Sequence, residues 1–448
     1  MSSHQVFYVG SYEEVGHHAE PLRNYMDLRI ASPEEVSRLA QPNDLAIFFS
    51  EHFHRFRKAW LTLHEKGCLT LYAIDGILEW RNAWENREDE PACPWTMRPV
   101  LSDKVACIGV SQARVLEQWG NYGKTEVVGI PRLSLPKTAA LERKKSDRFR
   151  ILITTAKWPA YTESQRQVIL QSLKDLHDFF SKHPEVAGRR IEVVWRIAGG
   201  LDQELQIQNQ LSDLSGREIA EVIRQVDAVI TTPSTVMLEG MLADLPVSLI
   251  DYTNSPEYVS SAWSIRAKDH IPEVVRQLVA PPVQRIQWQR SLLHDALQCQ
   301  EDASLRLSDL AQRMIQIAHD CRKAGKAVSF PARILDPPQG DRAEELRGYL
   351  HHVDWLEGKH HREYAVVAAE AIRWFERLNE QIETLERELA RASDGFEQIA
   401  NHPVLAPLLK VRKAAIGMGG QIAAALSSSR KMKDEMSAAL QEGAKVES

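Results

Sequence analysis

The chain has 448 residues, of which 44% are hydrophobic and 26% charged, and its net charge is −6. This length predicts two or three domains, and the composition is that of a globular protein with a large core. The acidic balance argues against nucleic acid as the main partner, because nucleic-acid binding usually requires a dominant basic surface. The five cysteines are scattered without a CxxC pair, and neither a secretory signal nor an apolar stretch of about eighteen residues is found, so a cytoplasmic location is expected.

The first part of the chain alternates between short apolar runs and helical patterns. The runs predict parallel strands at residues 6–9, 45–49, 69–74, 105–110 and 126–128. This alternation predicts a doubly wound α/β domain over residues 1–134. Such a sheet binds ligands outside the carboxyl ends of its strands. The candidate site residues therefore lie in the segments that follow the runs: a loop from Gly10 to His18, the turn from Asp75 to Arg81, Ser111 and Gln112, and the segment from Gly129 to Arg132.

A linker and a second sheet are expected next. Residues 135–149 are rich in Lys, Arg and Pro and lack apolar periodicity, which is typical of a linker. A second doubly wound domain is predicted over residues 150–280, with strands at 151–154, 191–197, 228–230 and 247–250. Lys157 follows the first of these strands, where an ammonium group could neutralise a diphosphate. The alternative is an ordinary exposed lysine.

The stretch from Asp227 to Asp251 predicts one βαβ unit. Thr232, Ser234 and Thr235 lie between its first strand and its helix, so hydroxyls, free backbone N–H groups and the positive end of the helix dipole would converge at one sheet edge. Such a point suits a phosphate. Glu239, one turn further on, could accept hydrogen bonds from a ribose or sugar hydroxyl. The alternative is a plain helix cap and a solvated glutamate.

Beyond residue 280 the pattern becomes helical. Residues 281–330 predict helices, and residues 360–400 predict a coiled coil. Residues 401–448 form a basic tail that either lies on an anionic membrane as an amphipathic segment or is partly disordered. The coiled-coil seam consists of apolar residues with alternating spacings of three and four: Phe375, Leu378, Ile382, Leu385, Leu389, Ala392, Phe396 and Ile399.

Two of these segments carry a resemblance to a known superfamily. The 227–251 segment resembles the signature in the C-terminal half of GT-B glycosyltransferases and of their relatives, the CDP-glycerol-type polymer transferases and sugar-nucleotide 2-epimerases. The sequence Val-Val-Gly-Ile-Pro-Arg at 127–132 is similar to the motif that closes the N-terminal domain in that superfamily. The resemblance covers roughly residues 5–320 and implies two Rossmann-like, doubly wound parallel-sheet domains in a GT-B-like fold, followed here by a helical, partly coiled-coil extension. It also implies that the helices of residues 281–330 pack back on the domains.

The resemblance implies a glycosyltransferase that moves a sugar from a nucleotide-activated donor to a hydroxyl of a surface polysaccharide, a lipid-linked glycan or a protein glycan. Two alternatives are a CDP-polyol phosphotransferase of similar geometry and a non-catalytic scaffold on a degenerate transferase fold. In the transferase, Lys157, Thr232, Ser234, Thr235 and Glu239 would bind the donor. Gly10, Glu79, Arg81 and Arg132 would line the acceptor side or the cleft.

Inverting transfer needs a group that takes the proton from the acceptor hydroxyl, and an ionised carboxylate or a neutral imidazole can do so. Asp75 is the first choice, because it follows an apolar strand and precedes Gly76, which permits a tight turn. His17 is the rival base. The alternatives are a plain Asp-Gly turn and a solvated histidine pair, with His18 expected to be solvated.

No metal site and no cofactor are expected. The histidine pairs His52-x-His54, His351-His352 and His360-His361 lack a Cys partner or Glu-x-x-His spacing. The nucleotide-activated sugar is a substrate. The expected partners are this donor, a glycan or lipid-linked acceptor, a second copy through the coiled coil, and an anionic membrane through the basic tail at the inner face.

Overall fold

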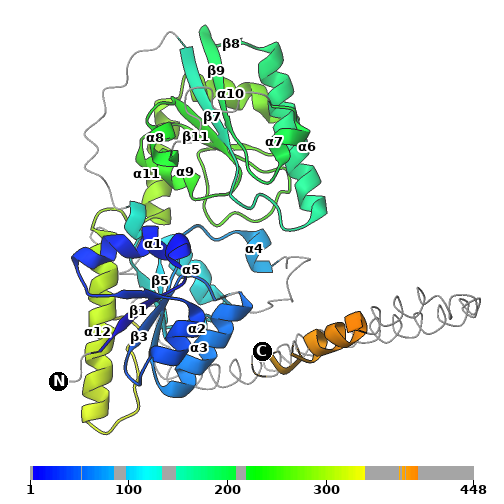
Figure 1. Cartoon of the computed structure of the whole chain (residues 1–448). Helices are drawn as coiled ribbons and strands as arrows, with labels where there is room; N and C mark the ends of the chain where they lie inside the picture. Colours follow the sequence, from blue (N-terminus) through cyan, green and yellow to red (C-terminus); the bar gives the residue numbers. More distant parts are fainter. Residues whose placement is uncertain are drawn as a thin grey trace, which may run out of the picture. The chain divides into compact units, whose positions relative to one another are not determined.

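The computed structural model describes residues 4–51, 53–84, 97–133, 148–207, 218–338, 373, 376–378 and 380–391. The chain divides into two compact units, 1–372 and 373–448. The first unit contains two separate six-stranded sheets (Figure 1). The fold class predicted from the sequence, two doubly wound sheet domains followed by helices, is therefore confirmed in the described part of the chain.

All neighbouring strands of the first sheet pair in parallel, in the order β2-β1-β3-β4-β5-β6. The strands are β1 (Val6–Val9), β2 (Arg29–Ala31), β3 (Leu45–Phe48), β4 (Leu69–Ala73), β5 (Lys104–Cys107) and β6 (Thr125–Val127). The helices are α1 (Tyr12–Ala19), η1 (Glu20–Asn24), α2 (Pro33–Leu39), α3 (His54–Lys66), α4 (Trp80–Trp84), α5 (Val110–Gln118) and η2 (Pro131–Leu133).

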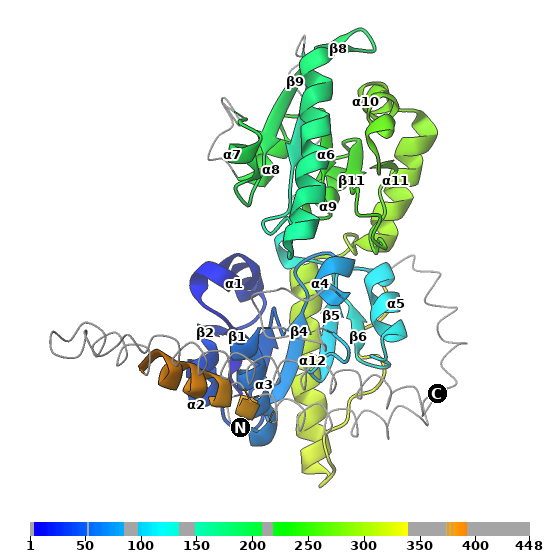
Figure 2. The same cartoon turned by 90° about the vertical axis from the view of Figure 1, so that its right-hand side faces the viewer.

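Apolar side chains from both faces of this sheet are buried. One face packs against α1, η1 and the later helix α12 (Ala303–Lys323), and the other packs against α2, α3 and α5. The views in Figures 1 and 2 agree with this layering. Burial on both faces explains why the strands read as continuous apolar runs. The edge strand β2 was not predicted, because it has only three residues and its first side chain is exposed.

The second sheet has the order β12-β11-β10-β7-β9-β8 and is parallel except for the pair β8 and β9. Its strands are β7 (Arg148–Thr154), β8 (Glu185–Val186), β9 (Arg189–Arg196), β10 (Ala228–Thr231), β11 (Val247–Ile250) and β12 (Trp263–Ile265). Its helices are α6 (Glu163–Lys182), α7 (Leu201–Glu204), α8 (Ile219–Ile223), α9 (Val236–Leu242), η4 (Lys268–His270) and α10 (Ile271–Val279). The predicted linker, 135–149, lies outside the described residues except for its last two, which belong to β7 and correct that boundary.

Two long helices follow, α11 (Val283–Ala296) and α12. Helix α11 packs against α9 of the second domain and α5 of the first, while α12 packs against η1, η2 and β4. The segment after α12 is tied to the first sheet by a buried ion pair. Nζ of Lys104 lies 2.8 Å from Glu126 and donates to the carbonyl of Pro331, and Glu126 accepts the N–H of Ile334. The chain therefore returns to the first domain after completing the second.

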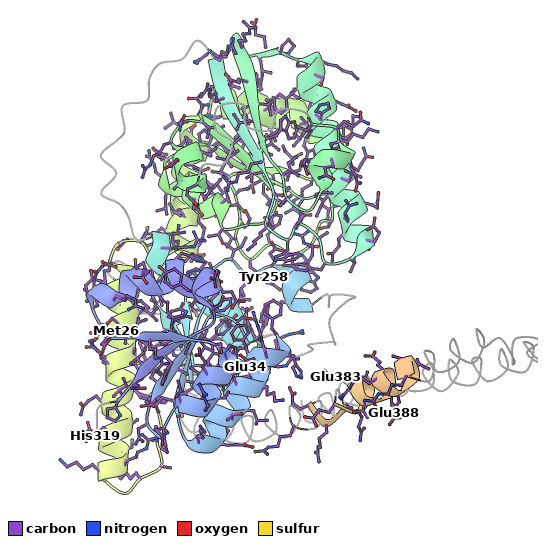
Figure 3. All side chains as sticks on the ribbon, in the orientation of Figure 1. Met26, Glu34, Tyr258, His319, Glu383 and Glu388 are labelled. Atoms are coloured by element: carbon purple, nitrogen blue, oxygen red, sulfur yellow. The ribbon has the colours of Figure 1, made fainter. Side chains whose placement is uncertain are left out.

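In the second unit, the described residues 376–378 and 380–391 are helical. Ile382, Leu385 and Leu389 are 38%, 56% and 43% exposed, so the apolar seam predicted for the coiled coil is not covered by the rest of this helix. Figure 3 labels Glu383 and Glu388 on the same helix. The predicted self-association stays a prediction, and the basic tail of 401–448 lies outside the described residues. None of the described helices is both long and apolar enough to cross a membrane.

Candidate active site

His18 and Asp75 form a charged contact at the carboxyl edge of the first sheet. His18 lies in the last turn of α1, Asp75 follows β4, and Nε2 of His18 is 3.1 Å from Oδ2 of Asp75. The His18 side chain is 2% exposed and that of Asp75 is 43% exposed. Burial alone would raise the pKa of Asp75, but the neighbouring His18 and Arg132 hold that pKa below its usual value. Asp75 is thus an ionised partner of His18.

This geometry corrects two expectations. The segment from Gly10 to His18 is not a loop, since α1 starts at Tyr12, and His18 is buried rather than solvated. The helix forms because the N–H of Ser11 donates to the Glu14 carboxylate, the reciprocal contact of a capping box. Val15, His18 and Ala19 are buried at spacings of three and four, the pattern of an amphipathic helix, which was not predicted for this segment.

His17 lies beside this pair on the exposed side of α1, with its ring centroid 3.8 Å from that of His18. Partial burial lowers the pKa of His17 to about 4, and the charges of His18, Arg132 and Lys157 act in the same direction, while Asp75 opposes them. His17 is therefore a neutral imidazole at pH 7. The effect of Lys157 shows that the loop after β7 of the second domain is close enough to act on His17 electrostatically.

Arg132 connects this cluster to the second domain. Its Nη1 lies 3.1 Å from Oε1 of Glu239 on α9, and the two side chains are 25% and 9% exposed. The sequence predicted Arg132 and Glu239 on opposite sides of a cleft and did not predict their contact. Glu239 is not the solvated residue of the alternative interpretation. The structure brings His17, His18, Asp75, Arg132 and Glu239 together, and we call these five residues the histidine cluster.

The turn between β10 and α9 differs in detail from the prediction. Ser234 is buried and its hydroxyl lies 3.2 Å from that of Thr231, so it is engaged within the turn. Thr232 accepts the N–H of Ala156 and thereby joins the turn to the loop after β7. Thr235 occupies the N-cap position but makes no side-chain capping bond. Because α9 has only seven residues, its dipole is a smaller contribution than the sequence predicted.

Thr235 also lies at the contact between the two sheet edges. A Cβ atom added to Gly76 would be 3.0 Å from Oγ1 of Thr235, tighter than an ordinary contact. Gly76 therefore permits the turn after β4, which carries Asp75, to approach the start of α9. Lys157 is exposed on the loop after β7. Thr235 and Lys157, two of the donor-binding candidates, therefore lie at this sheet edge, and no side-chain hydrogen bond or ion pair of either residue is found in the described part of the chain.

Glu79 and Arg81 belong to a second cluster. Arg81 is 2% exposed, its Nη1 donates to the carbonyl of Pro159 in the second domain, and its Nη2 lies 3.2 Å from Glu79. Burial raises the pKa of Glu79 to about 7, with Arg81 opposing and Asp251 assisting this change. Glu79 also forms a β-bridge with Glu257. These residues line a cavity of about 20 Å³, room for about one water molecule.

The contact between the two domains at Glu79 and Arg81 was not predicted from the sequence. Glu257 pairs with Arg266, and burial raises the pKa of Glu257 as well. Tyr258, labelled in Figure 3, packs edge-on against Trp119 at the end of α5, with ring centroids 5.5 Å apart. No local motif marks Glu257 or Tyr258, so only the three-dimensional structure could reveal them. Gly10, in contrast, lies at neither cluster and lines a groove beside β1 and β2.

No family model and no curated protein match the sequence. Among solved structures, the chain is similar to a variant of the wall teichoic acid polymerase TagF, with 12% identity, 71% of this chain and 90% of the other covered, and a TM-score of 0.47. A Listeria monocytogenes protein assigned as a UDP-N-acetylglucosamine 2-epimerase matches with 12% identity, 75% and 100% coverage, and a TM-score of 0.47. S. aureus MnaA bound to UDP matches with 9% identity, 74% and 100% coverage, and a TM-score of 0.44.

At this level of identity the similarities carry no information on chemistry, which must be inferred from the residues of this chain. Within the described ranges, no group of three or more His, Cys, Asp or Glu side chains is placed to hold a metal ion. The histidine cluster instead combines a neutral imidazole, an ionised carboxylate paired with a buried histidine, and an arginine paired with a glutamate of the second domain. Such a set can accept a proton at one point and stabilise negative charge a short distance away.

Proposed function

We propose that the protein is a glycosyltransferase that uses a nucleoside diphosphate sugar as donor and a glycan hydroxyl as acceptor. The observation that carries this proposal is the histidine cluster, in which groups from the carboxyl edge of the first sheet contact α9 of the second domain. Ligands of doubly wound sheets bind at these edges. Two such edges that share one charged cluster are suited to hold two substrates against each other.

The base in this proposal is His17 rather than Asp75. His17 is exposed and neutral at pH 7, so it can accept a proton, although its lowered pKa makes it a weaker base than an ordinary histidine. Asp75 is already paired with His18, so it is better suited to hold His18 and, through it, α1. His18 and Asp75 are therefore positioning residues for the neighbouring His17.

Arg132 and Lys157 are the groups that would stabilise the departing diphosphate. The positive charges of both side chains lower the pKa of His17. In sugar transfer, the bond between the anomeric carbon and the diphosphate oxygen breaks, the acceptor oxygen bonds to that carbon, and the acceptor proton goes to His17. Cations beside the leaving group offset the charge that develops there. Glu239 holds Arg132 in place and remains available to a ribose hydroxyl.

Calorimetric titration with UDP, GDP, CDP and the matching monophosphates tests the donor site. We expect one nucleoside diphosphate to bind and the Lys157→Gln variant to bind it roughly tenfold more weakly, as the loss of one charged contact implies. Lys182→Gln, which removes an exposed charge at the end of α6, is the matched control and should bind like the wild type. Equal affinity in wild type and Lys157→Gln would refute the assignment.

The alternative reaction, transfer of a polyol phosphate from a CDP donor, makes a different product. In that reaction the bond to the second phosphorus breaks, so the nucleotide leaves as CMP, whereas sugar transfer releases a nucleoside diphosphate. Mass spectrometry of the released nucleotide therefore separates the two activities. A protein that binds no nucleotide of the panel would instead support the scaffold alternative.

A further inference from the structure

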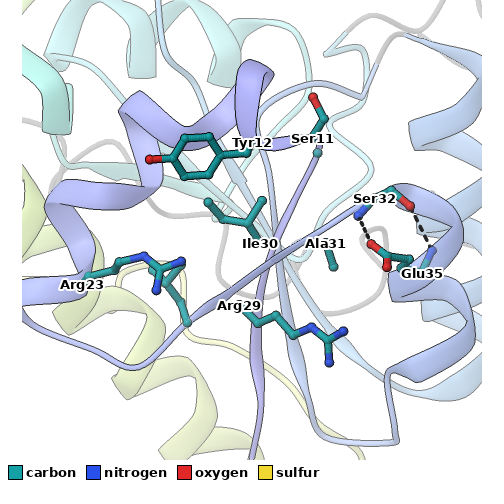
Figure 4. A pocket seen from close by; sticks show the side chains of 10 residues that line it. Ser11, Tyr12, Arg23, Arg29, Ile30, Ala31, Ser32 and Glu35 are labelled. Carbon is teal, nitrogen blue, oxygen red and sulfur yellow. Dashed lines mark hydrogen bonds between the residues drawn. The ribbon is translucent and has the colours of Figure 1, made fainter.

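An open groove lies at the carboxyl ends of β1 and β2, on the side of the first sheet away from β4. It encloses about 530 Å³ and is lined by residues that include Ser11, Tyr12, Arg23, Arg29 and Ser32 (Figure 4). The groove contains none of the residues of the histidine cluster. It is much larger than the cavity beside Glu79, so it has room for a ligand rather than for a single water molecule.

Two arginines line the groove. Arg29 is exposed, and no ion pair of Arg29 is found in the described part of the chain. Arg23 pairs with Glu20, but both side chains are 45% exposed, and such surface pairs contribute little and exchange readily for another anion. The carboxylate of Glu35, also in the lining, is engaged by the N–H of Ser32. Two guanidinium groups and one carboxylate therefore line the groove, and a second carboxylate, that of Glu20, lies beside Arg23.

Tyr12 adds an aromatic surface to these charges. Its side chain is 61% exposed, yet its ring rests on Gly16, where an added Cβ atom would be only 3.2 Å from the ring. The glycine thus allows the ring to lie along α1 instead of extending into solvent. An exposed tyrosine held in this way offers an apolar face and a hydroxyl to a ligand, a combination common at recognition surfaces.

Helix α1 connects the groove to the histidine cluster. Its first residue, Tyr12, lines the groove, and its last turn carries His17 and His18. At about 1.5 Å per residue, five residues place His17 about 8 Å along the helix from Tyr12. Because five residues also turn the helix by about 140°, a chain-like ligand in the groove would pass around α1 as well as along it to reach His17.

We propose that this arginine groove binds an anionic group, a phosphodiester or a carboxylate, that an oligomeric acceptor carries at a distance from its reacting hydroxyl. Guanidinium groups suit both anions because their donors match the oxygens of phosphate and carboxylate. Tyr12 packs against the adjoining unit of the acceptor. This inference rests on the proposed function, since it names the class of acceptor, but binding in the groove does not require a donor and can be measured separately.

The test uses the full chain and three oligomers of similar length: a glycerol phosphate oligomer, an oligogalacturonate and a neutral dextran. We expect at least one of the two anionic oligomers to bind with an affinity that falls as salt rises, and the dextran not to bind. The anionic oligomer that binds shows whether the recognised group is a phosphodiester or a carboxylate. Equal binding of the dextran, or binding of neither anionic oligomer at millimolar concentration, would overturn the proposal.

Two variants locate the binding. In the double variant Arg23→Gln and Arg29→Gln, affinity for the anionic oligomer should fall roughly tenfold or more. The control is Arg38→Gln with Arg224→Gln, which removes the same charge from exposed positions outside the groove and should leave affinity unchanged. Arg29→Glu alone changes the charge by the same two units and should weaken binding by a similar factor. Equal affinity in the wild type and the groove variants, or equal losses in the groove and control variants, would contradict the assignment.

Nucleotide affinity, measured in the same variants, separates this proposal from the previous one. It should be unchanged in the groove variants, because neither arginine belongs to the histidine cluster. If a nucleotide binds and neither anionic oligomer does, the groove proposal fails alone. If an anionic oligomer binds in the groove and no nucleotide binds, the proposed function fails and the groove proposal still holds.

Discussion

Glu79→Gln should remove a pH dependence of stability that arises at the contact between the two domains. Glu79 has a pKa of about 7 in the folded protein, against 4.5 for an ordinary glutamate, mainly because its side chain is buried and only 9% exposed. Since the folded state holds this proton more tightly, the stabilisation from Glu79 is fully present below pH 4.5 and is lost as the pH rises to about 7. A pKa difference of this size corresponds to about 3 kcal/mol.

Urea unfolding of the wild type and of Glu79→Gln, followed by tryptophan fluorescence at several pH values between 4.5 and 7.5, measures this effect. The amide keeps the shape of the side chain and does not titrate. We expect the free energy of unfolding of the wild type, relative to the variant, to fall by about 3 kcal/mol across this range. The control is Glu34→Gln on α2, an exposed glutamate labelled in Figure 3. A difference between wild type and Glu79→Gln that is independent of pH would refute the buried position of Glu79.

The remaining predictions concern the base, the buried ion pair and the second unit. His17→Gln should lower turnover by about 10²–10⁴ with donor affinity nearly intact, measured by steady-state kinetics and calorimetry, whereas loss of donor affinity would move His17 to the donor site. Asp75→Asn should leave donor affinity intact, and turnover close to that of the wild type would show that the pairing with His18 is dispensable. Lys104→Ala should destabilise the first domain by about 3–5 kcal/mol in urea unfolding, because it leaves a buried carboxylate unpaired, and a loss below about 1 kcal/mol would contradict this. Ile382→Glu with Leu385→Glu should abolish self-association in light scattering, since burial of each side chain is worth about 1.5–3 kcal/mol, and a monomeric wild type would disprove the predicted coiled coil.

The architecture was predictable because its strands are buried on both faces. Val6–Val9 and Val247–Ile250 are buried at every position, so they appear in the sequence as short apolar runs between turns. The strand Arg29–Ala31 was missed because an edge strand with an exposed arginine leaves no such run. Of the four edge strands, the pattern predicted β6, which is buried at every position, and missed β2, β8 and β12.

The candidate site was predictable in its location but not in its contacts. Asp75 and Glu239 were found because both follow strands at a sheet edge, and this depends only on local pattern. The contact between Arg132 and Glu239 joins residues 107 positions apart, and the burial of His18 depends on how α1 lies on the sheet. The raised pKa of Glu79 likewise depends on burial by the second domain. Such properties belong to the tertiary structure, and no sequence spacing encodes them.

The most direct test of the central claim is the release of nucleotide from a panel of UDP-, GDP- and CDP-activated sugars, followed by mass spectrometry, in the wild type and in Lys157→Gln. If the histidine cluster is a sugar-transfer site, one donor should release its nucleoside diphosphate, and the variant should do so roughly tenfold or more slowly because a cation beside the leaving group is lost. Lys182→Gln should match the wild type. Release of no nucleoside diphosphate from any donor, or equal rates in wild type and Lys157→Gln, would contradict the account.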